Sequence, residues 1–137
     1  MRYLLDTNIL IYIANRRPPA VESRLAGLRP GDVGMSVITD LELIYGAWKS
    51  KHREASLLRI QELERLIPVL PLDAGVGQTY GQMRAELERK GTPIGAYDLL
   101  IAAHALTLGL TLVTNNVREF RRVPRLIVEN WAEGKSA

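Results

Sequence analysis

Short apolar runs alternate along the chain with longer segments whose apolar residues recur at helical spacing. Strands are predicted where a short apolar run is bounded by polar or turn residues, at 2–5, 33–37, 69–72, 110–114 and, at a sheet edge, 126–128. Helices are predicted over 21–28, 38–49, 54–67, 74–90 and 98–108. This alternation indicates an α/β fold with a mostly parallel sheet covered on both faces, in a single domain spanning residues 1–137.

The segment at 9–13 is apolar throughout, so periodicity alone does not classify it. Thr7 and Asn8, which precede it, are favourable residues at the start of a helix. Two consecutive prolines, Pro18 and Pro19, follow it closely and would end a helix. We therefore predict a helix over 7–15.

Composition narrows the class of protein. The chain has 137 residues and is 47% hydrophobic, which suffices for one compact domain with a sizeable core. No stretch is apolar for the ~18 residues that a membrane span requires. Asp6 and Asn8 interrupt the first apolar run, so we expect no signal peptide. The absence of cysteine excludes disulfides, thiolate chemistry and cysteine-based zinc sites, and a cytoplasmic protein is the expectation.

The charge balance is mildly basic, with a formal net charge of +3 and an isoelectric point of about 9.4. Most of the basic residues are arginine, which forms forked hydrogen bonds to phosphate. Four arginines follow the strand at 110–114, and such a cluster is usually a solvated face. Because this cluster follows the polar loop after that strand, which is a candidate active-site loop, phosphate contact is a comparable alternative for Arg118, Arg121 and Arg122, with Arg125 as the fourth member.

Acidic residues stand beside apolar runs in four distant parts of the chain, at Asp6, Glu42, Asp98 and Glu119. Ligands of open α/β sheets bind outside the carboxyl ends of the strands, and Asp6 directly follows the strand at 2–5. Carboxylates gathered there repel one another unless a cation joins them. The pattern therefore predicts a site for a hard divalent cation at this edge of the sheet.

Helix capping is the alternative explanation for three of these acids. Asp6 and Asp98 could each cap the helix that follows. Thr39 and Glu42 have the spacing of a capping box, in which the glutamate reaches back to the start of its own helix. Capping explains each acid singly, but it does not explain why all three fall at one predicted sheet edge.

Three other polar residues are interpreted as structural. Asp40 lies two residues from Glu42 and so points to another side of the helix, and we assign it to solvent. Asp73 is expected to cap the helix at 74–90. His104 lies on an apolar helix and is expected to be a buried histidine with its hydrogen bonds satisfied. Because His52 is the only other histidine in the chain, a histidine-based metal site is not expected.

Four ordered motifs then give a family resemblance. They are DTNIL at 6–10, SVITDLELIYG at 36–46, GTPIGAYDLLIAAHAL at 91–106 and LVTNNVREFRRVPRLIVENW at 112–131. Together they resemble the PIN-domain ribonucleases, and in particular the VapC-type toxins of bacterial and archaeal toxin–antitoxin pairs. The resemblance implies a three-layer α/β/α fold around a mostly parallel sheet of four to five strands. It also implies a Mg²⁺- or Mn²⁺-dependent endoribonuclease that hydrolyses phosphodiester bonds with an activated water.

Carried over by motif, the resemblance assigns Asp6, Glu42 and Asp98 to the three core acidic positions. Asn116 stands where the family commonly has a fourth acid, and Glu119 is the candidate to replace that charge. The metal is thus expected on Asp6, Asp98, Asn116 and Glu119, with Glu42 orienting or deprotonating the water. Small polar residues that support the metal waters are expected at Thr7, Asn8, Ser36 and Thr114.

The partners that the resemblance implies are an RNA substrate, a VapB-type antitoxin that blocks the acidic pocket, and a second copy of the chain in a homodimer. Two other classes of protein remain as alternatives. One is a non-catalytic RNA- or protein-binding module whose acids only cap helices. The other is a receiver-type Mg²⁺-binding signalling domain, which would need a lysine directly after a late strand, and the residues directly after the strand at 110–114 include none.

Overall fold

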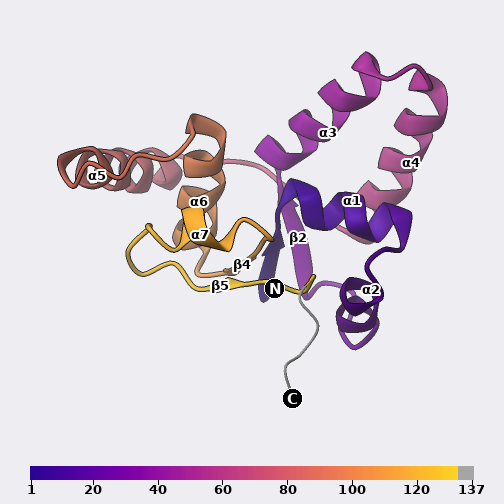
Figure 1. Cartoon of the computed structure of the whole chain (residues 1–137), viewed down its shortest axis with the longest axis horizontal. Helices are drawn as coiled ribbons and strands as arrows, with labels where there is room; N and C mark the ends of the chain where they lie inside the picture. Colours follow the sequence, from indigo (N-terminus) through magenta and orange to yellow (C-terminus); the bar gives the residue numbers. More distant parts are fainter. Residues whose placement is uncertain (133–137) are drawn as a thin grey trace.

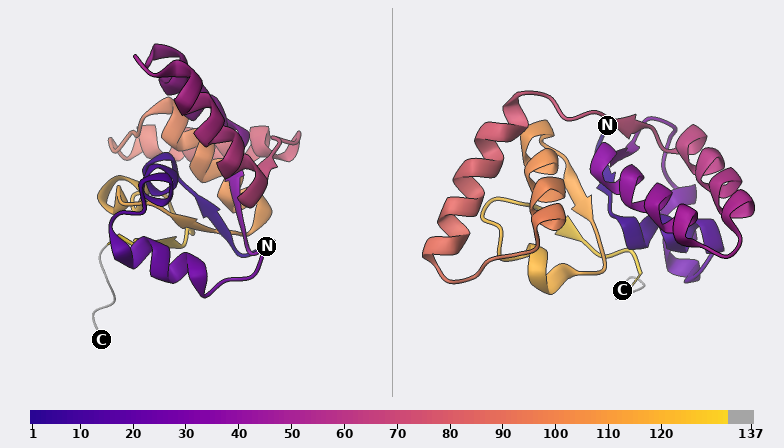
Figure 2. Two further views of the ribbon diagram at one scale, coloured as in Figure 1. Left: turned by 90° about the vertical axis from the view of Figure 1, so that its right-hand side faces the viewer. Right: turned by 90° about the horizontal axis from the view of Figure 1, so that it is seen from above.

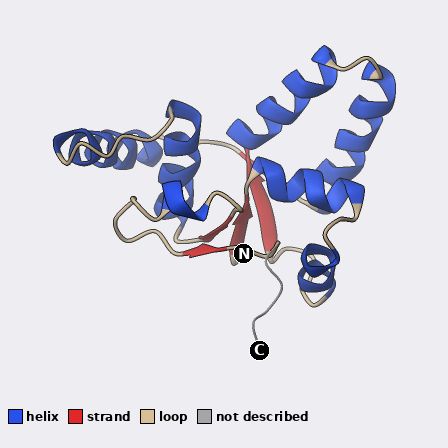
Figure 3. Ribbon diagram, in the orientation of Figure 1, coloured by secondary structure: helices blue, strands red, loops and turns tan. Residues whose placement is uncertain are grey.

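A parallel sheet of five strands forms the centre of the computed structural model, which describes residues 1–132 (Figures 1 and 3). All four strand pairings are parallel, and the order across the sheet is β3-β2-β1-β4-β5. The strands are β1 Tyr3–Leu5, β2 Val33–Ser36, β3 Val69–Leu70, β4 Thr111–Val113 and β5 Val128–Glu129. The predicted parallel sheet is confirmed, although β5 begins two residues later than the pattern indicated.

Seven helices connect and cover these strands within residues 1–132. They are α1 Thr7–Asn15, α2 Pro19–Ala26, α3 Val37–Lys49, α4 Arg53–Leu66, α5 Gly75–Arg89, α6 Ala96–Leu108 and α7 Val117–Phe120. The α3–α4 hairpin extends away from the sheet on one side, and α5 extends beside α6 on the other (Figure 1). No helix in this part of the chain is long and apolar enough to cross a membrane.

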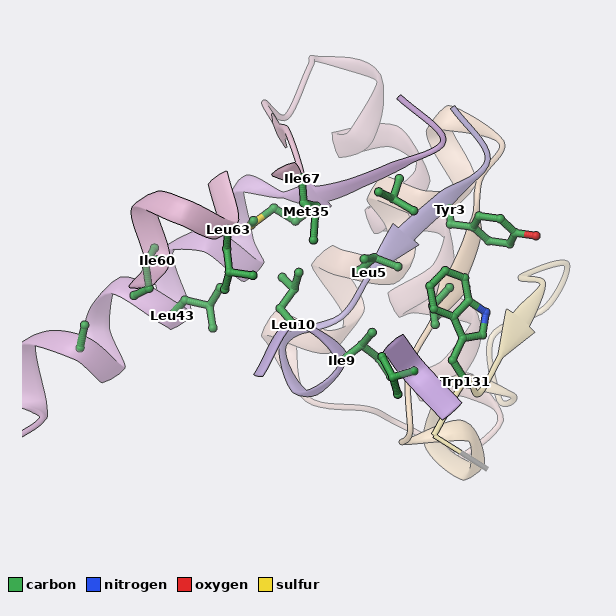
Figure 4. Packing of buried hydrophobic residues seen from close by; sticks show 14 residues of the cluster. Tyr3, Leu5, Ile9, Leu10, Met35, Leu43, Ile60, Leu63, Ile67 and Trp131 are labelled. Atoms are coloured by element: carbon green, nitrogen blue, oxygen red, sulfur yellow. The ribbon is translucent and has the colours of Figure 1, made fainter. Parts of the chain in front are cut away.

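Side chains on the two faces of the sheet build two separate cores, because successive strand residues point to opposite faces. Tyr3 and Leu5 pack on one face with residues of α1 to α4 and with Trp131 (Figure 4). Leu4 points to the other face and packs with residues of α5 and α6 and with Phe120 of α7. The helices of the first half of the chain accordingly lie on one side and α5 and α6 on the other (Figure 2). The predicted three-layer arrangement is confirmed.

The strand order creates a topological switch point between β1 and β4. From β1 the chain builds β2 and β3 outward in one direction, and it then returns to form β4 and β5 on the opposite side of β1. The connections after β1 and after β4 therefore diverge at the carboxyl ends of these two strands, which is the place where open α/β sheets bind ligands. Asp6 and Thr114 are the first residues after these two strands.

Candidate active site

Asp6 and Thr114 join the two central strands at the switch point. The Asp6 amide donates to the Val113 carbonyl at 2.9 Å, which extends the pairing of β1 with β4. The Asp6 carboxylate accepts hydrogen bonds from the Thr7 amide at 2.7 Å and from Thr114 Oγ1 at 2.8 Å. Asp6 therefore caps α1, as one interpretation of the sequence had it, and also lies at the predicted site.

Glu42 reaches this site from α3. Thr7 Oγ1 donates to Glu42 Oε1 at 3.2 Å and so links the start of α1 to the second turn of α3. The capping-box alternative for Glu42 is wrong, because α3 begins at Val37 and its N-cap is Ser36, whose Oγ accepts from the Ile38 amide at 3.1 Å. Glu42 lies in the second turn of α3, where its carboxylate is free to face α1.

Ser36 is enclosed beneath the site instead of lining it. The side chain is fully buried, and its Oγ contacts Nδ1 of His104 at 2.8 Å in addition to capping α3. This differs from the expectation that Ser36 supports metal waters, since its hydroxyl is already occupied by protein groups. His104 is buried as predicted, but the prediction that its hydrogen bonds are satisfied is wrong for Nε2, which has no hydrogen-bond partner among residues 1–132. Burial is the main cause that lowers the pKa of His104.

Asp98 lies in the first turn of α6, which begins at Ala96 and not at the predicted residue 98. The Asp98 side chain makes no cap, since Gly95 occupies the N-cap position. Burial raises the pKa of Asp98 to about 6, and the charges of Asp6, Glu119 and Glu42 contribute in that order. The four predicted acids thus act on one another electrostatically although they come from four separate elements.

Asp6 and Glu42 experience the same crowding in a weaker form. Burial is the main cause that raises the pKa of Asp6, and hydrogen bonds from Thr114 and Thr7 partly offset it. Burial also raises the pKa of Glu42, which the charge of Asp6 raises further and the Thr7 hydroxyl lowers. An oxygen-rich pocket whose carboxylates resist ionisation would gain stability from any cation placed among them.

Glu119 faces the acidic pocket from α7. Its Oε1 accepts from the Gly95 amide at 3.1 Å, and its Oε2 accepts from Asn116 Nδ2 at 2.7 Å. The negative charge of Glu119 is close enough to raise the pKa of both Asp6 and Asp98. Glu119 therefore stands as the fourth acid of the cluster.

Asn115 belongs to the rim of the site, although no individual role was predicted for it. Its Nδ2 donates to the Tyr12 hydroxyl at 2.7 Å, and its Oδ1 accepts from Asn8 Nδ2 at 3.2 Å. These contacts bind the turn after β4 to α1. The only signal in the sequence was its place between Thr114 and Asn116. Asn8 is exposed and takes part in this contact.

The arginine cluster follows the acidic pocket at the surface. Arg118, Arg121 and Arg122 are all exposed on α7 and the turn after it. Arg122 donates to the Pro93 carbonyl at 3.1 Å, which places it beside the loop that leads to Asp98. These positions are compatible with contacts to the backbone of a bound nucleic acid.

Two of the residues interpreted as structural have different outcomes. Asp73 Oδ1 accepts from the Gly75 amide at 2.8 Å at the start of α5, as predicted for a cap. The assignment of Asp40 to solvent is wrong, because its side chain is half-buried and lies against Glu64 of α4. A hydrogen bond with Asp40 is the main cause that raises the pKa of Glu64. The amphipathic register of α3 did not reveal this contact, because it depends on how α4 returns along α3.

The donors at the pocket fit a hard divalent cation. Carboxylate oxygens from Asp6, Glu42, Asp98 and Glu119 are the ligands that Mg²⁺ prefers. Within residues 1–132, however, no three acidic or histidine side chains converge tightly enough to enclose an ion as they stand. Mg²⁺ keeps several waters and uses one or two carboxylates together with substrate phosphates, so an open pocket of this kind is compatible with it.

An apolar groove begins at the acidic pocket and runs between α1, α3 and α4. Its volume is about 300 Å³. Thr7 and Glu42 line one end, Ser50 and Arg59 line the other, and apolar residues such as Leu43 lie between them. The groove connects the candidate site to the α3–α4 hairpin.

The sequence also matches proteins of known class. The model of the PIN domain matches residues 3–126. The tRNA(fMet)-specific endonuclease VapC of Shigella flexneri is 44% identical over 132 residues, which cover 96% of this chain and 99% of that protein. Ribonuclease VapC2 of Rickettsia felis is 42% identical over 96% of this chain and 98% of its own length.

Solved structures give the same result. The DNA-bound VapBC of Salmonella typhimurium contains a chain with a TM-score of 0.90 and 42% identity, matched over 96% of this chain and 98% of that one. VapBC-1 of nontypeable Haemophilus influenzae contains another such chain, with a TM-score of 0.90 and 41% identity, matched over 97% of this chain and 100% of that one.

That residues 1–137 form one domain stays a prediction, since residues 133–137 lie outside the described part.

Proposed function

The chain belongs to the PIN-domain family, and from this premise we propose that it is an endoribonuclease and the toxin of a toxin–antitoxin pair. The observation that carries the proposal is the convergence of Asp6, Glu42, Asp98 and Glu119 at the β1–β4 switch point, where each acid acts on its neighbours. The relatives named as ribonucleases align with nearly the whole chain, so the correspondence includes this pocket.

We propose further that the pocket takes Mg²⁺ or Mn²⁺. Asp6, Asp98 and Glu119 would hold the ion, which when bound would supply Lewis-acid stabilisation of the negative charge on the scissile phosphate. Glu42 has a raised pKa and is oriented by Thr7, so it is suited to accept a proton from the attacking water. Thr114 holds Asp6 in place through a 2.8 Å hydrogen bond.

The substrate would be bound through its phosphates near α7. Arg118, Arg121 and Arg122 follow the acidic pocket, and arginine forms forked hydrogen bonds to phosphate oxygens. The relative from S. flexneri is named as an endonuclease specific for tRNA(fMet), which is the initiator tRNA, and it is 44% identical to this chain. Initiator tRNA is therefore the first RNA to test, with ribosomal and messenger RNA beside it.

The partner that would control this activity is a VapB-type antitoxin, since the solved relatives are VapBC complexes. The groove between α1, α3 and α4 offers an apolar path that ends at Thr7 and Glu42. A segment of the antitoxin lying there would reach the acidic pocket. An arginine of that segment paired with Asp6 or Asp98 would occupy the place of the cation.

A homodimer is also proposed, on the basis of exposed apolar residues on α3. Leu41, Tyr45 and Trp48 are spaced to lie on one side of this helix, and they are 42%, 66% and 54% exposed. Grouped exposed apolar residues mark surfaces that another protein covers.

Cleavage of labelled RNA tests the enzyme directly. We expect the purified chain to cut initiator tRNA or another cellular RNA at discrete positions with Mg²⁺ or Mn²⁺, and to stop when EDTA is added. Asp98→Asn, purified in parallel, is the control for a contaminating nuclease. RNA that is bound and stays intact under all metal conditions would favour the non-catalytic binding module.

A further inference from the structure

We infer that Asn116 is a positioning residue that holds the Glu119 carboxylate toward Asp6 and Asp98 and does not itself bind the metal. This inference rests on the proposed function, because it concerns the fourth corner of the same pocket. It also departs from the expectation that Asn116 is a metal ligand. Asn116 precedes α7, which is only four residues long and carries Glu119.

The hydrogen bonds of Asn116 belong to a continuous series that links Glu119 to Asp6 through Thr114. Its Nδ2 donates to Glu119 Oε2 at 2.7 Å, and its backbone N–H donates to Thr114 Oγ1 at 3.0 Å. The same Thr114 oxygen donates to Asp6 Oδ2 at 2.8 Å. Asn116 thus connects two acids of the pocket, which come from different ends of the chain.

Glu119 needs such a contact because its charge is repelled within the pocket. Its negative charge opposes those of Asp6 and Asp98. The Gly95 amide donates to Oε1 at 3.1 Å and Asn116 donates to Oε2, so each oxygen of the carboxylate is held by its own donor. An amide can donate to a carboxylate, whereas an ionised aspartate at this position would only accept hydrogen bonds and would add to the repulsion.

The neighbouring Asn115 provides a matched control on the same turn. Its amide faces away from Glu119, with Nδ2 on the Tyr12 hydroxyl and Oδ1 on Asn8 Nδ2. Removing either asparagine side chain deletes the same chemical group at adjacent positions. Only the loss of Asn116 should act through Glu119.

A double-mutant cycle on Mn²⁺ binding separates positioning from ligation. The proteins are the wild type, Asn116→Ala, Glu119→Ala and the double variant, and the readout is the Mn²⁺ dissociation constant by calorimetry without RNA. We expect Asn116→Ala to weaken binding by about 10- to 100-fold, as is usual when a residue that orients a ligand is lost. In the Glu119→Ala background the same change should have an effect below about twofold, because there is no carboxylate left to hold.

Two results at Asn116 would overturn the inference. One is a further loss in the double variant as large as that of Asn116→Ala alone, since independent effects indicate that Asn116 contacts the metal itself. The other is unchanged binding in both Asn116→Ala and Asn116→Ser. The serine variant keeps a hydroxyl donor and is expected to bind between the wild type and Asn116→Ala. Thermal melts of each variant without metal establish that it is folded.

The Asn115→Ala control and the wild type complete the test. Any effect of Asn115→Ala should be the same with and without Glu119, because its amide contacts α1. If the wild type cleaves RNA while Glu119→Ala binds Mn²⁺ like the wild type, the inference fails and the proposed nuclease stands. If the wild type neither binds Mn²⁺ nor cleaves RNA, both are overturned.

Discussion

At the scale of single residues, uncharged hydrogen-bond donors orient the acidic side chains of the pocket. Thr7 and Thr114 donate to Asp6, and the Thr7 hydroxyl also donates to Glu42. Asp98 is in a different position, because burial and three neighbouring charges raise its pKa to about 6. Ionised Asp98 therefore destabilises the folded protein, and its replacement should raise stability while it abolishes activity.

Asp98→Asn should stabilise the metal-free protein and abolish RNA cleavage. The pKa rises from 3.8 to about 6, and each unit corresponds to about 1.4 kcal/mol before solvent screening is allowed for. Because Asp98 is only half-buried, we expect a gain of about 1–2 kcal/mol in the free energy of unfolding at pH 7, measured by urea denaturation with EDTA. Glu62→Gln, which removes an exposed carboxylate on α4, is the control and should stay within about 0.5 kcal/mol. A less stable Asp98→Asn would contradict the shared carboxylate site.

The gain in the free energy of unfolding from Asp98→Asn should become smaller as the pH falls. The folded protein binds the Asp98 proton more tightly than the unfolded chain does, so ionised Asp98 lowers stability and its protonation removes that cost. The difference between variant and wild type should be largest at pH 7 and above, and should shrink as the pH falls from about 6 toward 3.8. The comparison cancels the opposite contribution of His104, whose pKa is lowered in the folded state. The free energies of unfolding of both proteins at pH 7.5, 6 and 5 measure this difference. A difference that stays constant over this range would contradict the prediction.

At the scale of elements, Ser36 connects α3, which carries Glu42, to the core. Ser36→Ala removes the N-cap of α3 and leaves His104 Nδ1 without its 2.8 Å contact. Loss of a serine cap costs about 0.5–2 kcal/mol, and we expect the upper part of this range because the site is buried. Ser50→Ala is the matched control, since Ser50 caps the exposed turn after α3 through the His52 amide. Thermal melts of both variants measure the difference, and equal losses would show that burial of Ser36 adds nothing.

Elements with strong local signals could be predicted from the sequence, and those defined by tertiary contacts could not. The helix at 7–15 was predicted with the observed bounds, because Thr7 and Asn8 are favourable residues at a helix start and Pro18 and Pro19 follow its end. The four-residue α7 was not predicted, since one turn is too short to show a period. Glu42 was compatible with a capping box until the structure placed the start of α3 at Val37. Spacing along the chain cannot show whether Glu42 caps its own helix or faces the site, because β2 and α3 are contiguous and the first residue of the helix is not marked in the sequence.

The same distinction holds for the site. Asp6, Glu42 and Asp98 could be selected from the sequence because they adjoin predicted elements at one sheet edge, and the family motifs support them. The orientation of Glu119 could not be predicted, because it depends on Asn116 and on the Gly95 amide of a loop 24 residues away. Asn115 and its contact with Tyr12 also required the packing of α1 beside the turn after β4.

At the scale of the whole molecule, the pocket depends on the topology of the sheet. The divergence of the chain after β1 and β4 brings Asp6 beside Thr114, and α6 and α7 add Asp98 and Glu119 from the second half of the chain. Mutual repulsion of these carboxylates is a cost that the fold bears when no cation is present. Metal binding should therefore be visible as stability of the entire domain.

Added Mn²⁺ should raise the melting temperature of the wild type. A ligand that binds only the folded state stabilises it by about 2.7 kcal/mol at a hundredfold excess over its dissociation constant. The increase should follow the logarithm of the Mn²⁺ concentration and disappear on addition of EDTA. Asp98→Asn should begin from a higher melting temperature and show a much smaller increase, because it lacks both the repulsion and the ligand. An equal increase in the two proteins would place the bound Mn²⁺ elsewhere on the molecule, and no increase at millimolar Mn²⁺ would contradict a metal site in the pocket.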